Sequence, residues 1–432
     1  MRPLTDHALW ITAAPSPSAR ETAPLPANPW ESGKEGWKDR RAPFPADAGL
    51  MLIFRDFHTE EPCAGASVTV TALGLYDLWC NGRRVGEVHD GATVYNEMCP
   101  GHTVFSRRAQ ATTYDLTPFL CRGDNRLLAV LSGGWYGGRI SFGTYGFAPP
   151  CLWAEIVLPQ ADGSVARLST DEGWMSAWDG PVLFSDIWDG ELQDLRRSGY
   201  ETLSQYGAVP AHAAPAVPVP GIGAEVTEQI GPQVRLRPEI SPTPVQCVIW
   251  EGVSGDGTDF GRINALHVSD GFAPVHLSAG QHLQLDLGQN MVGRERLRIR
   301  GAAGVRVTVA YAEMKNDSGE RSRGNDGPAG SLYVENYRSA KAKCEYILSG
   351  AEEGDLCMPR YGFCGFRYFE ITADGDIFVT EAGAVVLGSD LREVGRLETS
   401  DPEVNRLLSN IRWGQRGNYL SIPTDCPQRD ER

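Results

Sequence analysis

The residues best suited to chemistry lie in one short stretch, from Asp425 to Glu431, which contains three carboxylates and Arg429 within seven positions. Pro423 lies just before this stretch and Pro427 lies within it. Proline fixes its own backbone and restricts the residue before it, so the segment is predicted to be a stiff, irregular loop and not a helix interior. Loops fixed by a scaffold tend to carry function, although a polar surface turn would have the same composition.

The loop contains the groups that acid–base chemistry on a polyol would need. Repulsion from Asp425 and Asp430 would raise the pKa of Glu431, and Arg429 would offset part of that effect. Glu431 is therefore a candidate general acid. Asp425 and Arg429 also suit hydroxyl groups, because a carboxylate accepts hydrogen bonds and a guanidinium donates them as a fork. None of the three carboxylates is placed to act from the opposite side of a bond.

The composition excludes several classes of function. A chain of 432 residues is long enough for two to four domains. Its content of 41% hydrophobic and 22% charged residues is typical of a globular protein. The net charge of −15 disfavours nucleic acid and anionic membranes as partners, since binding phosphate needs a basic face. The sequence has no GxSxG, HExxH or P-loop motif for other chemistries.

The cysteines and the N-terminus suggest a compartment. Ten cysteines are scattered singly, without a CxxC or zinc spacing, which predicts reduced and mostly buried thiols in a cytoplasmic protein. A disulfide framework remains the alternative. No apolar leader and no run of ~18 apolar residues is visible. No metal or cofactor is expected.

Two β-rich regions precede the loop. Residues 50–57 form the first convincing strand, and Asn81-Gly82 between apolar flanks predicts a hairpin with a type I′ turn. Short strands punctuated by glycine and proline are typical of a β-sandwich or jelly roll. Residues 207–245 contain eight prolines, which predicts a semi-rigid linker. Strands then return between residues 283 and 371.

After residue 390, the spacing of apolar residues changes from the alternation of strands to the three-to-four-residue period of a helix. Asp401-Pro402-Glu403 is a helix start, with Asp as the cap and Pro at the first helical position. The spacing predicts one amphipathic helix over about 401–414, ended by Gly414 and Gly417. Its apolar stripe consists of Val404, Leu407, Leu408 and Ile411.

The sequence of the last segment closely resembles the catalytic loop of bacterial α-L-rhamnosidases. This segment reads Ser421-Ile-Pro-Thr-Asp-Cys-Pro-Gln-Arg-Asp-Glu-Arg432. The bacterial α-L-rhamnosidases are inverting glycoside hydrolases with a six-hairpin (α/α) barrel. The resemblance implies that Glu431 is the general acid and that Asp425 binds sugar hydroxyls. Arg429 and Asp430 are predicted as further substrate-binding residues. The resemblance also implies a general base far downstream, in barrel sequence that this chain lacks.

Earlier segments resemble the two β-domains of the same family, in the same order. One departure stands at Pro100-Gly101-His102, where the family commonly has Pro-Gly-Trp, and it puts a stacking role at that position in doubt. The segments that carry the likeness are Gly74-Leu-Tyr-Asp-Leu-Trp-Cys-Asn-Gly-Arg-Arg-Val-Gly86, Gly133-Gly-Trp-Tyr-Gly-Gly-Arg139, Asp186-Ile-Trp-Asp-Gly-Glu-Leu-Gln-Asp-Leu-Arg196, Asp286-Leu-Gly-Gln-Asn-Met-Val-Gly293 and Pro359-Arg-Tyr-Gly-Phe-Cys-Gly-Phe-Arg-Tyr368.

The expected fold is mainly β, with two consecutive jelly-roll-like β-sandwich domains followed by the first helix and loop of an (α/α)6 six-hairpin barrel. The expected division is an extended N-terminal segment at 1–48, a carbohydrate-binding-like β-sandwich at 49–206, a Pro-rich linker at 207–245, a second β-sandwich at 246–390 and a truncated start of the catalytic domain at 391–432.

The expected function is that of an α-L-rhamnosidase, which hydrolyses terminal α-L-rhamnose from glycosides by inversion. This chain is expected to be the N-terminal part of such an enzyme and to be inactive alone, because it lacks the general base. The expected partner is a rhamnose-containing glycoside or oligosaccharide. A non-catalytic carbohydrate-binding protein and a six-hairpin glycosidase of different sugar specificity are the alternatives.

Overall fold

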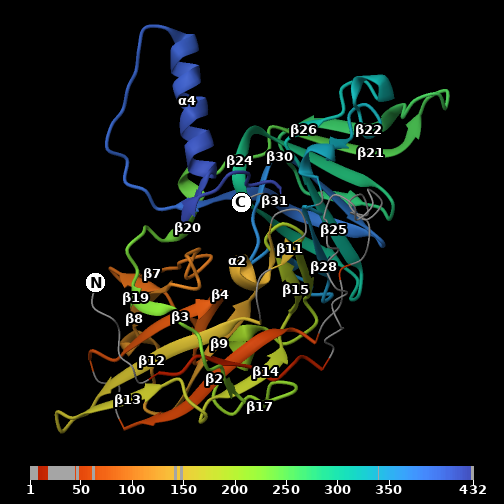
Figure 1. Cartoon of the computed structure of the whole chain (residues 1–432). Coiled ribbons are helices and arrows are strands. Elements are labelled where there is room, and N and C mark those ends of the chain that lie inside the picture. The colour runs from red at the N-terminus through yellow and green to blue at the C-terminus, as the bar shows by residue number, and fades with distance from the viewer. Residues whose placement is uncertain are drawn as a thin grey trace.

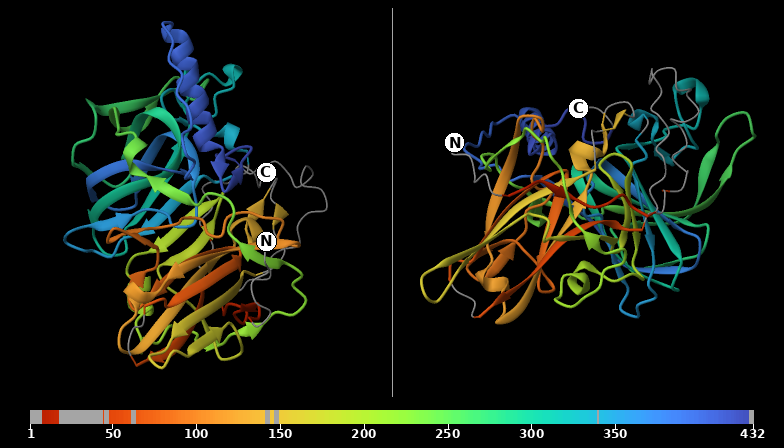
Figure 2. Two further views of the ribbon diagram at one scale, coloured as in Figure 1. Left: turned by 90° about the vertical axis from the view of Figure 1, so that its left-hand side faces the viewer. Right: turned by 60° about the horizontal axis from the view of Figure 1, so that its bottom comes forward.

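The computed structural model describes residues 8–17, 44, 48–60, 64–140, 144–145, 149–338 and 340–429. Two β-sandwiches lie against each other, and helix α4 (Pro402–Gly417) projects from the second sandwich (Figure 1, Figure 2). The mainly β architecture confirms the predicted fold class. Of the extended N-terminal segment expected at 1–48, the structure describes only residues 8–17, 44 and 48.

The first sandwich consists of two packed sheets whose orders are β18-β1-β12-β3-β8-β19, with β13 beside β12, and β17-β14-β2-β9-β4-β5. Alternate residues on β3, Val68, Val70 and Ala72, are buried in its core, as expected for a strand with one face inward. The strands of the first sheet are β1 (Ile11–Thr12), β3 (Ser67–Leu73), β8 (Arg108–Asp115), β12 (Cys151–Pro159), β13 (Val165–Ser169), β18 (Val217–Pro218) and β19 (Glu225–Glu228). Those of the second are β2 (Leu50–Thr59), β4 (Leu75–Cys80), β5 (Arg83–Arg84), β9 (Gly123–Ser132), β14 (Met175–Asp179) and β17 (Ala214–Pro215).

The predicted hairpin turn is present between β4 and β5. Asn81 and Gly82 have φ values of 49° and 81°, which is the left-handed pair that a type I′ turn requires. The strands that flank the turn pair in register, Cys80 with Arg83 and Trp79 with Arg84. The Asn-Gly prediction is confirmed.

The second sandwich is one strongly bent twelve-stranded sheet. Its long strand β24 (His282–Gly301) pairs with β30 along its first half and with β31 along its second half, so that it belongs to both layers. The other strands are β15 (Val182–Asp186), β16 (Gly190–Asp194), β20 (Val234–Arg237), β21 (Gln246–Ser254), β22 (Arg262–Asp270), β23 (Val275–Leu277), β25 (Arg306–Ala312), β28 (Lys343–Ile347), β29 (Asp355–Cys357), β30 (Cys364–Ala373) and β31 (Ile377–Ser389).

The division between the sandwiches differs from the expected one. Strands β15 and β16 fall within the range 49–206, but β16 pairs in parallel with β28 of the second sandwich. The predicted linker at 207–245 contributes β17, β18 and β19 to the first sandwich and β20 to the second. Strands in this range therefore pair with both sandwiches, whereas a semi-rigid linker was expected. Short strands look alike in sequence whichever sheet they join, because only the partner strand distinguishes them.

Helix α4 matches its prediction and runs one turn further, to Gly417. The Asp401 carboxylate accepts from the N–H groups of Glu403 (2.8 Å) and Val404 (3.4 Å), as a cap should. In the described part of the chain, no helix is both long and apolar enough to cross a membrane.

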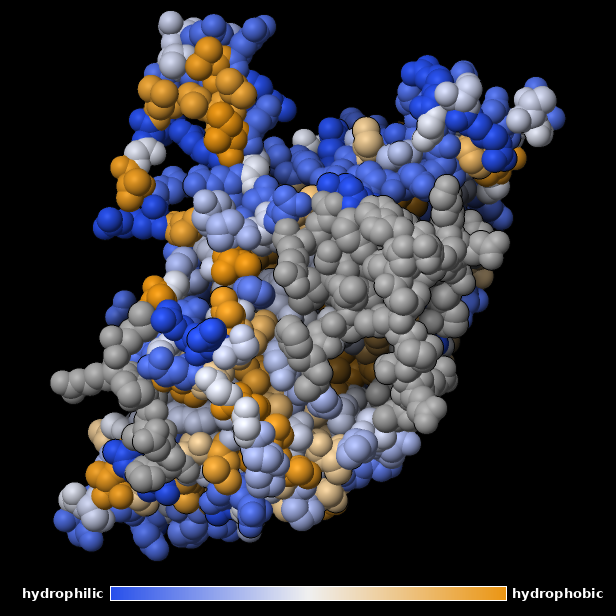
Figure 3. All heavy atoms as spheres, viewed as in Figure 1, coloured by the Kyte–Doolittle hydropathy of each residue, from blue (hydrophilic) through white to orange (hydrophobic). Residues whose placement is uncertain are grey.

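The apolar stripe of α4 is open to solvent. Leu407 and Ile411 are each 56% exposed, and Val394 in the segment before the helix is 83% exposed. Figure 3 shows apolar side chains gathered over α4 and this segment. An amphipathic helix normally buries such a face, so the stripe marks a surface that lacks a partner among the described residues.

The two sandwiches share one apolar core at their interface. The outward face of β2 and β4, including Leu52 and Leu75, packs in the same cluster as Val292 of β24 and Tyr361 and Phe363 of the loop before β30. Burial of apolar side chains is the dominant favourable contribution to the free energy of such an interface. The sandwiches therefore form a single unit.

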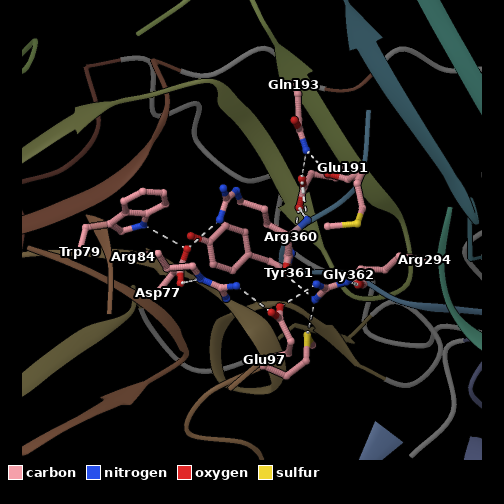
Figure 4. A network of polar contacts seen from close by, with 12 residues as sticks. Asp77, Trp79, Arg84, Glu97, Glu191, Gln193, Arg294, Arg360, Tyr361 and Gly362 are labelled. Carbon is pink, nitrogen blue, oxygen red and sulfur yellow. Dashed lines mark hydrogen bonds and ion pairs between the residues drawn. The ribbon is translucent and has the colours of Figure 1, made fainter. Parts of the chain in front are cut away.

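A chain of buried charges crosses this interface (Figure 4). Arg84 on β5 donates to Asp77 (2.6 Å) and to Glu97 (2.8 Å). Glu97 also accepts from Arg294 of β24 (2.7 Å), whose guanidinium continues to the carbonyl of Gly362 (2.8 Å). Asp77 in turn accepts from Arg360 (2.9 Å). Each sandwich thus supplies charges that the other neutralises.

The electrostatics of Glu97 depend on this pairing. Burial alone would raise its pKa, but the Arg84 and Arg294 guanidiniums outweigh burial and hold the pKa at about 2. Glu97 therefore stays ionised although its side chain is only 4% exposed. A buried ionised carboxylate that loses a partner is costly.

The same network holds the loop before β30. Glu191 of β16 accepts from the backbone N–H groups of Arg360 (3.1 Å) and Tyr361 (3.0 Å). Burial raises the pKa of Glu191, while these N–H groups and the Gln193 amide act in the opposite direction. The side chain of Arg360 is held by Asp77, and the carbonyl of Gly362 is held by Arg294. The backbone from Arg360 to Gly362 is therefore held from both sandwiches.

We expect Arg294→Ala to reduce the free energy of unfolding by about 3–5 kcal/mol, because it removes one of the two guanidiniums of buried Glu97. Arg296→Ala on the same strand is the matched control. Arg296 is 51% exposed and pairs with Glu381 at 3.1 Å, so its loss should cost less than about 1 kcal/mol. Urea denaturation measures both, and equal losses would contradict the importance of the buried network.

Candidate functional site

The carboxylate loop, residues 418–432, follows α4 and begins with a small hairpin, β32 (Tyr419–Leu420) and β33 (Ile422–Pro423). Leu420 is fully buried in the interface core between the sandwiches. The N–H of Thr424 donates to the carbonyl of Asn418 at 2.8 Å and closes the hairpin. The loop thus starts from a packed anchor, as the predicted stiffness requires.

Two of the four predicted site residues are described, and the structure links them. Asp425 is exposed, and its Oδ2 accepts from the thiol of Cys426 at 3.1 Å. Arg429 is half-buried, and its Nε donates to the same Cys426 Sγ at 3.1 Å. Cys426, which sequence reasoning did not single out, therefore holds the carboxylate and the guanidinium together. Asp430 and Glu431 lie outside the described residues.

The tip of the hairpin is held by both sandwiches. Ser421 adopts a left-handed backbone, with φ of 72°, which is unfavourable for a residue with a side chain. Its Oγ accepts from the backbone N–H of His102 (3.1 Å) in the first sandwich, and its N–H donates to Ser389 Oγ (2.9 Å) at the end of β31. These two bonds compensate for the strained conformation.

Glycines permit this close approach. Gly101 has φ of +84°, and a Cβ built there would overlap the Ser421 hydroxyl. On the opposite side, the N–H of Gly365 at the start of β30 donates to the carbonyl of Pro427 at 3.0 Å. A Cβ at Gly365 would lie 3.3 Å from the Gln428 Cβ. The loop is therefore clamped between Gly101 and Gly365.

A cavity of about 710 Å³ lies behind the hairpin. Ile422, Pro423 and Thr424 of the hairpin line it, together with His102 and Trp135. This volume falls within the range of small-molecule sites. Among the described residues, no group of three or more His, Cys, Asp or Glu side chains is placed to hold a metal ion.

The sequence of this chain matches three protein-family models. They are the α-L-rhamnosidase N-terminal domain at residues 61–238, the bacterial α-L-rhamnosidase concanavalin-like domain at 276–386 and the bacterial α-L-rhamnosidase 6 hairpin glycosidase domain at 392–432. The chain belongs to the bacterial α-L-rhamnosidase family. The carboxylate loop falls in the third match.

Curated α-L-rhamnosidases resemble this chain along most of its length. One from Streptomyces avermitilis is 34% identical over 420 residues, which is 96% of this chain and 35% of that protein. One from Formosa agariphila is 29% identical over 384 residues, or 87% of this chain and 36% of that protein. The chain thus spans little more than a third of the length of these relatives.

Solved rhamnosidase structures share the fold. The Streptomyces avermitilis α-L-rhamnosidase complexed with L-rhamnose is similar with a TM-score of 0.69 at 30% identity, over 90% of this chain and 33% of that one. The native enzyme from Aspergillus terreus gives a TM-score of 0.69 at 26% identity, over 99% of this chain and 41% of that one. The resemblance of this sequence to the rhamnosidase family is confirmed.

Sequence reasoning missed the contacts that position the loop. The departure at Pro100-Gly101-His102 was visible, but its partner, Ser421, is 319 residues beyond His102. No local pattern connects the two. Gly101 was the only available signal, since an isolated glycine often marks a close backbone approach.

We expect Gly101→Ala to release the hairpin tip, because the new methyl group would overlap the Ser421 hydroxyl. Hydrogen exchange at the Ser421 and Gly365 amides should accelerate by about tenfold or more. Gly91→Ala is the matched control. Gly91 has a similar φ of +80° but open space around its Cβ, so it carries the same backbone cost of about 1–2 kcal/mol without the overlap. Unchanged exchange in Gly101→Ala would disprove the clamp.

Proposed function

We propose that the protein is an inverting α-L-rhamnosidase that removes terminal α-L-rhamnose from glycosides, and that this chain provides its two β-sandwiches and its carboxylate loop. The main support is the loop itself, in which Asp425 and Arg429 are joined through Cys426 and the backbone is clamped by both sandwiches. Catalytic groups need this kind of preorganised support.

In the proposed mechanism, Glu431 protonates the glycosidic oxygen as the bond to rhamnose breaks. Asp425 and Asp430 accept hydrogen bonds from the sugar hydroxyls, and Arg429 donates to them. Inversion also needs a carboxylate base on the far side of the sugar, about 6.5–9.5 Å from the acid, to activate a water molecule. We propose that this base belongs to the part of the six-hairpin domain that lies beyond the match at 392–432.

The open stripe of α4 supports this proposal. Val404, Leu407 and Ile411 form an apolar face that is not covered within the described residues. The helix lies in the segment that matches a six-hairpin glycosidase domain. Further helices of that domain would bury the stripe and hold the side of the loop that faces away from the sandwiches.

We also propose a cytoplasmic, reducing location. The nine cysteines within the described residues are free thiols, and eight of them are buried. Disulfides are rare in cytosolic proteins because their thiols are kept reduced. Immunolocalisation of the native protein in fractionated cells would test this proposal.

In a protein that includes the complete helical domain, Glu431→Gln should lower kcat/KM by ~10²–10⁴-fold on an alkyl rhamnoside, whose leaving group needs a proton. A 4-nitrophenyl rhamnoside needs little protonation and should lose much less. Asp425→Asn should lower kcat/KM for both substrates to a similar degree, since it acts on the sugar. Equal losses on both substrates in Glu431→Gln would mean that Glu431 is not the acid.

A polypeptide of these 432 residues alone is expected not to hydrolyse rhamnosides. Removing one of two coupled catalytic groups usually forfeits most of the acceleration. The measurement is release of 4-nitrophenol from 4-nitrophenyl α-L-rhamnoside, compared with buffer. Turnover that Glu431→Gln abolishes would show that these residues contain their own base.

A further inference from the structure

The cavity behind the carboxylate loop has walls suited to a flat ring. Four aromatic side chains line it: Phe105, Trp135, Tyr136 and Trp188. They are at most 9% exposed, and Phe105 and Tyr136 pack edge to face with their ring centroids 5.4 Å apart. The rings are therefore held rigidly. Aromatic side chains fixed in the wall of a cavity can make apolar and stacking contacts with a sugar ring or an aromatic ring.

The polarity of the cavity restricts the charge of its ligand. None of the described lining residues is Asp, Glu, Lys or Arg. Hydrogen-bonding capacity comes from Thr103, Ser106 and Thr424, together with the His102 ring. The indole N–H of Trp188 is buried and has no hydrogen-bond partner among the described residues. Such a site suits a neutral ligand that carries hydroxyl groups.

The position of the cavity connects it to the reaction. The wall formed by Ile422, Pro423 and Thr424 leads directly into Asp425. His102 also lines the cavity, and its backbone N–H donates to Ser421 Oγ at 3.1 Å. A ligand in the cavity would therefore contact the same backbone that positions the candidate catalytic groups.

We propose that this cavity binds the aglycone of the rhamnoside, as a neutral hydroxylated ring that is either the next sugar of an oligosaccharide or an aromatic group. The proposal rests on the proposed function, because the cavity would hold the part of the substrate that leaves. The first sandwich would then determine substrate choice, through the segment from His102 to Ser106 and through Trp135.

Val104→Trp tests the proposal without disturbing the core. Val104 lines the cavity and is 64% exposed, so an indole there should obstruct the cavity while leaving the fold intact. Val209→Trp is the matched control, since Val209 is 88% exposed and does not line the cavity. Thermal unfolding should be similar for the two variants.

The first measurement uses the 432-residue chain and phenyl β-D-glucoside, a neutral probe with both kinds of ring and no rhamnose. Titration monitored by tryptophan fluorescence should show binding that Val104→Trp weakens by about tenfold. Val209→Trp should bind like the parent chain. Absence of binding to the parent chain, or equal binding by both variants, would overturn the proposal.

The second measurement uses a protein with the complete helical domain and compares three rhamnosides. Methyl α-L-rhamnoside has no aglycone ring, whereas phenyl α-L-rhamnoside and rhamnosyl-(1→6)-glucose each have one. Val104→Trp should raise KM for a ring-bearing substrate and leave methyl rhamnoside unchanged. The substrate whose KM rises identifies the aromatic or the sugar ring as the natural occupant.

The two proposals fail in different ways. If the longer protein cleaves no rhamnoside while phenyl glucoside binding still depends on Val104, the rhamnosidase function is wrong and the cavity remains a ring-binding site. If all three rhamnosides are cleaved and Val104→Trp changes their KM values equally, the rhamnosidase function stands and the aglycone assignment is wrong.

Discussion

The ion pairs that join the two sandwiches are the constraint on which the rest of the structure depends. Glu97 from the first sandwich and Arg294 from the second are almost fully buried and neutralise each other at 2.7 Å. Neither charge could be buried at reasonable cost without the other. Because Arg294 also holds the carbonyl of Gly362 at 2.8 Å, the relative placement of the sandwiches and the conformation of the loop before β30 are decided together.

This arrangement lets both β-domains shape the carboxylate loop. The loop before β30 leads into Gly365, whose N–H binds the carbonyl of Pro427, and the first sandwich presents Gly101 and His102 to Ser421 on the other side. The carboxylate loop thus takes its shape from elements on both sides of the interface. A shift of one sandwich relative to the other would move Asp425 and Arg429 together.

The loop and the helix before it differ in how their apolar residues are covered. In the loop, Leu420 is buried in the interface core, and Ile422 to Thr424 line the cavity. In α4, Leu407 and Ile411 are exposed. The two sandwiches therefore pack around the loop and form a cavity beside it. Helix α4 presents an exposed apolar surface that suits further packing.

Local features of this protein were determined by the sequence itself. The Asn81-Gly82 turn follows from the positive φ angles that these residues tolerate, and the start of α4 follows from the Asp401 cap. Both depend on energies between residues that are near neighbours in the chain. The sequence of the carboxylate loop is also a local feature, and it was enough to indicate the family and the candidate residues Asp425 and Arg429.

Only the tertiary structure decided which distant segments meet. Strand β16 joined the second sandwich and not the first, the Pro-rich range at 207–245 became paired strands, and Glu97 found Arg294 from 197 residues away. Such pairings depend on how complete sheets pack and which charges are buried together, and a strand or a glutamate has the same local sequence whichever partner it finds. The clamp at Ser421 and the aromatic cavity belong to this second group, because each is formed by surfaces that exist only after both sandwiches have folded.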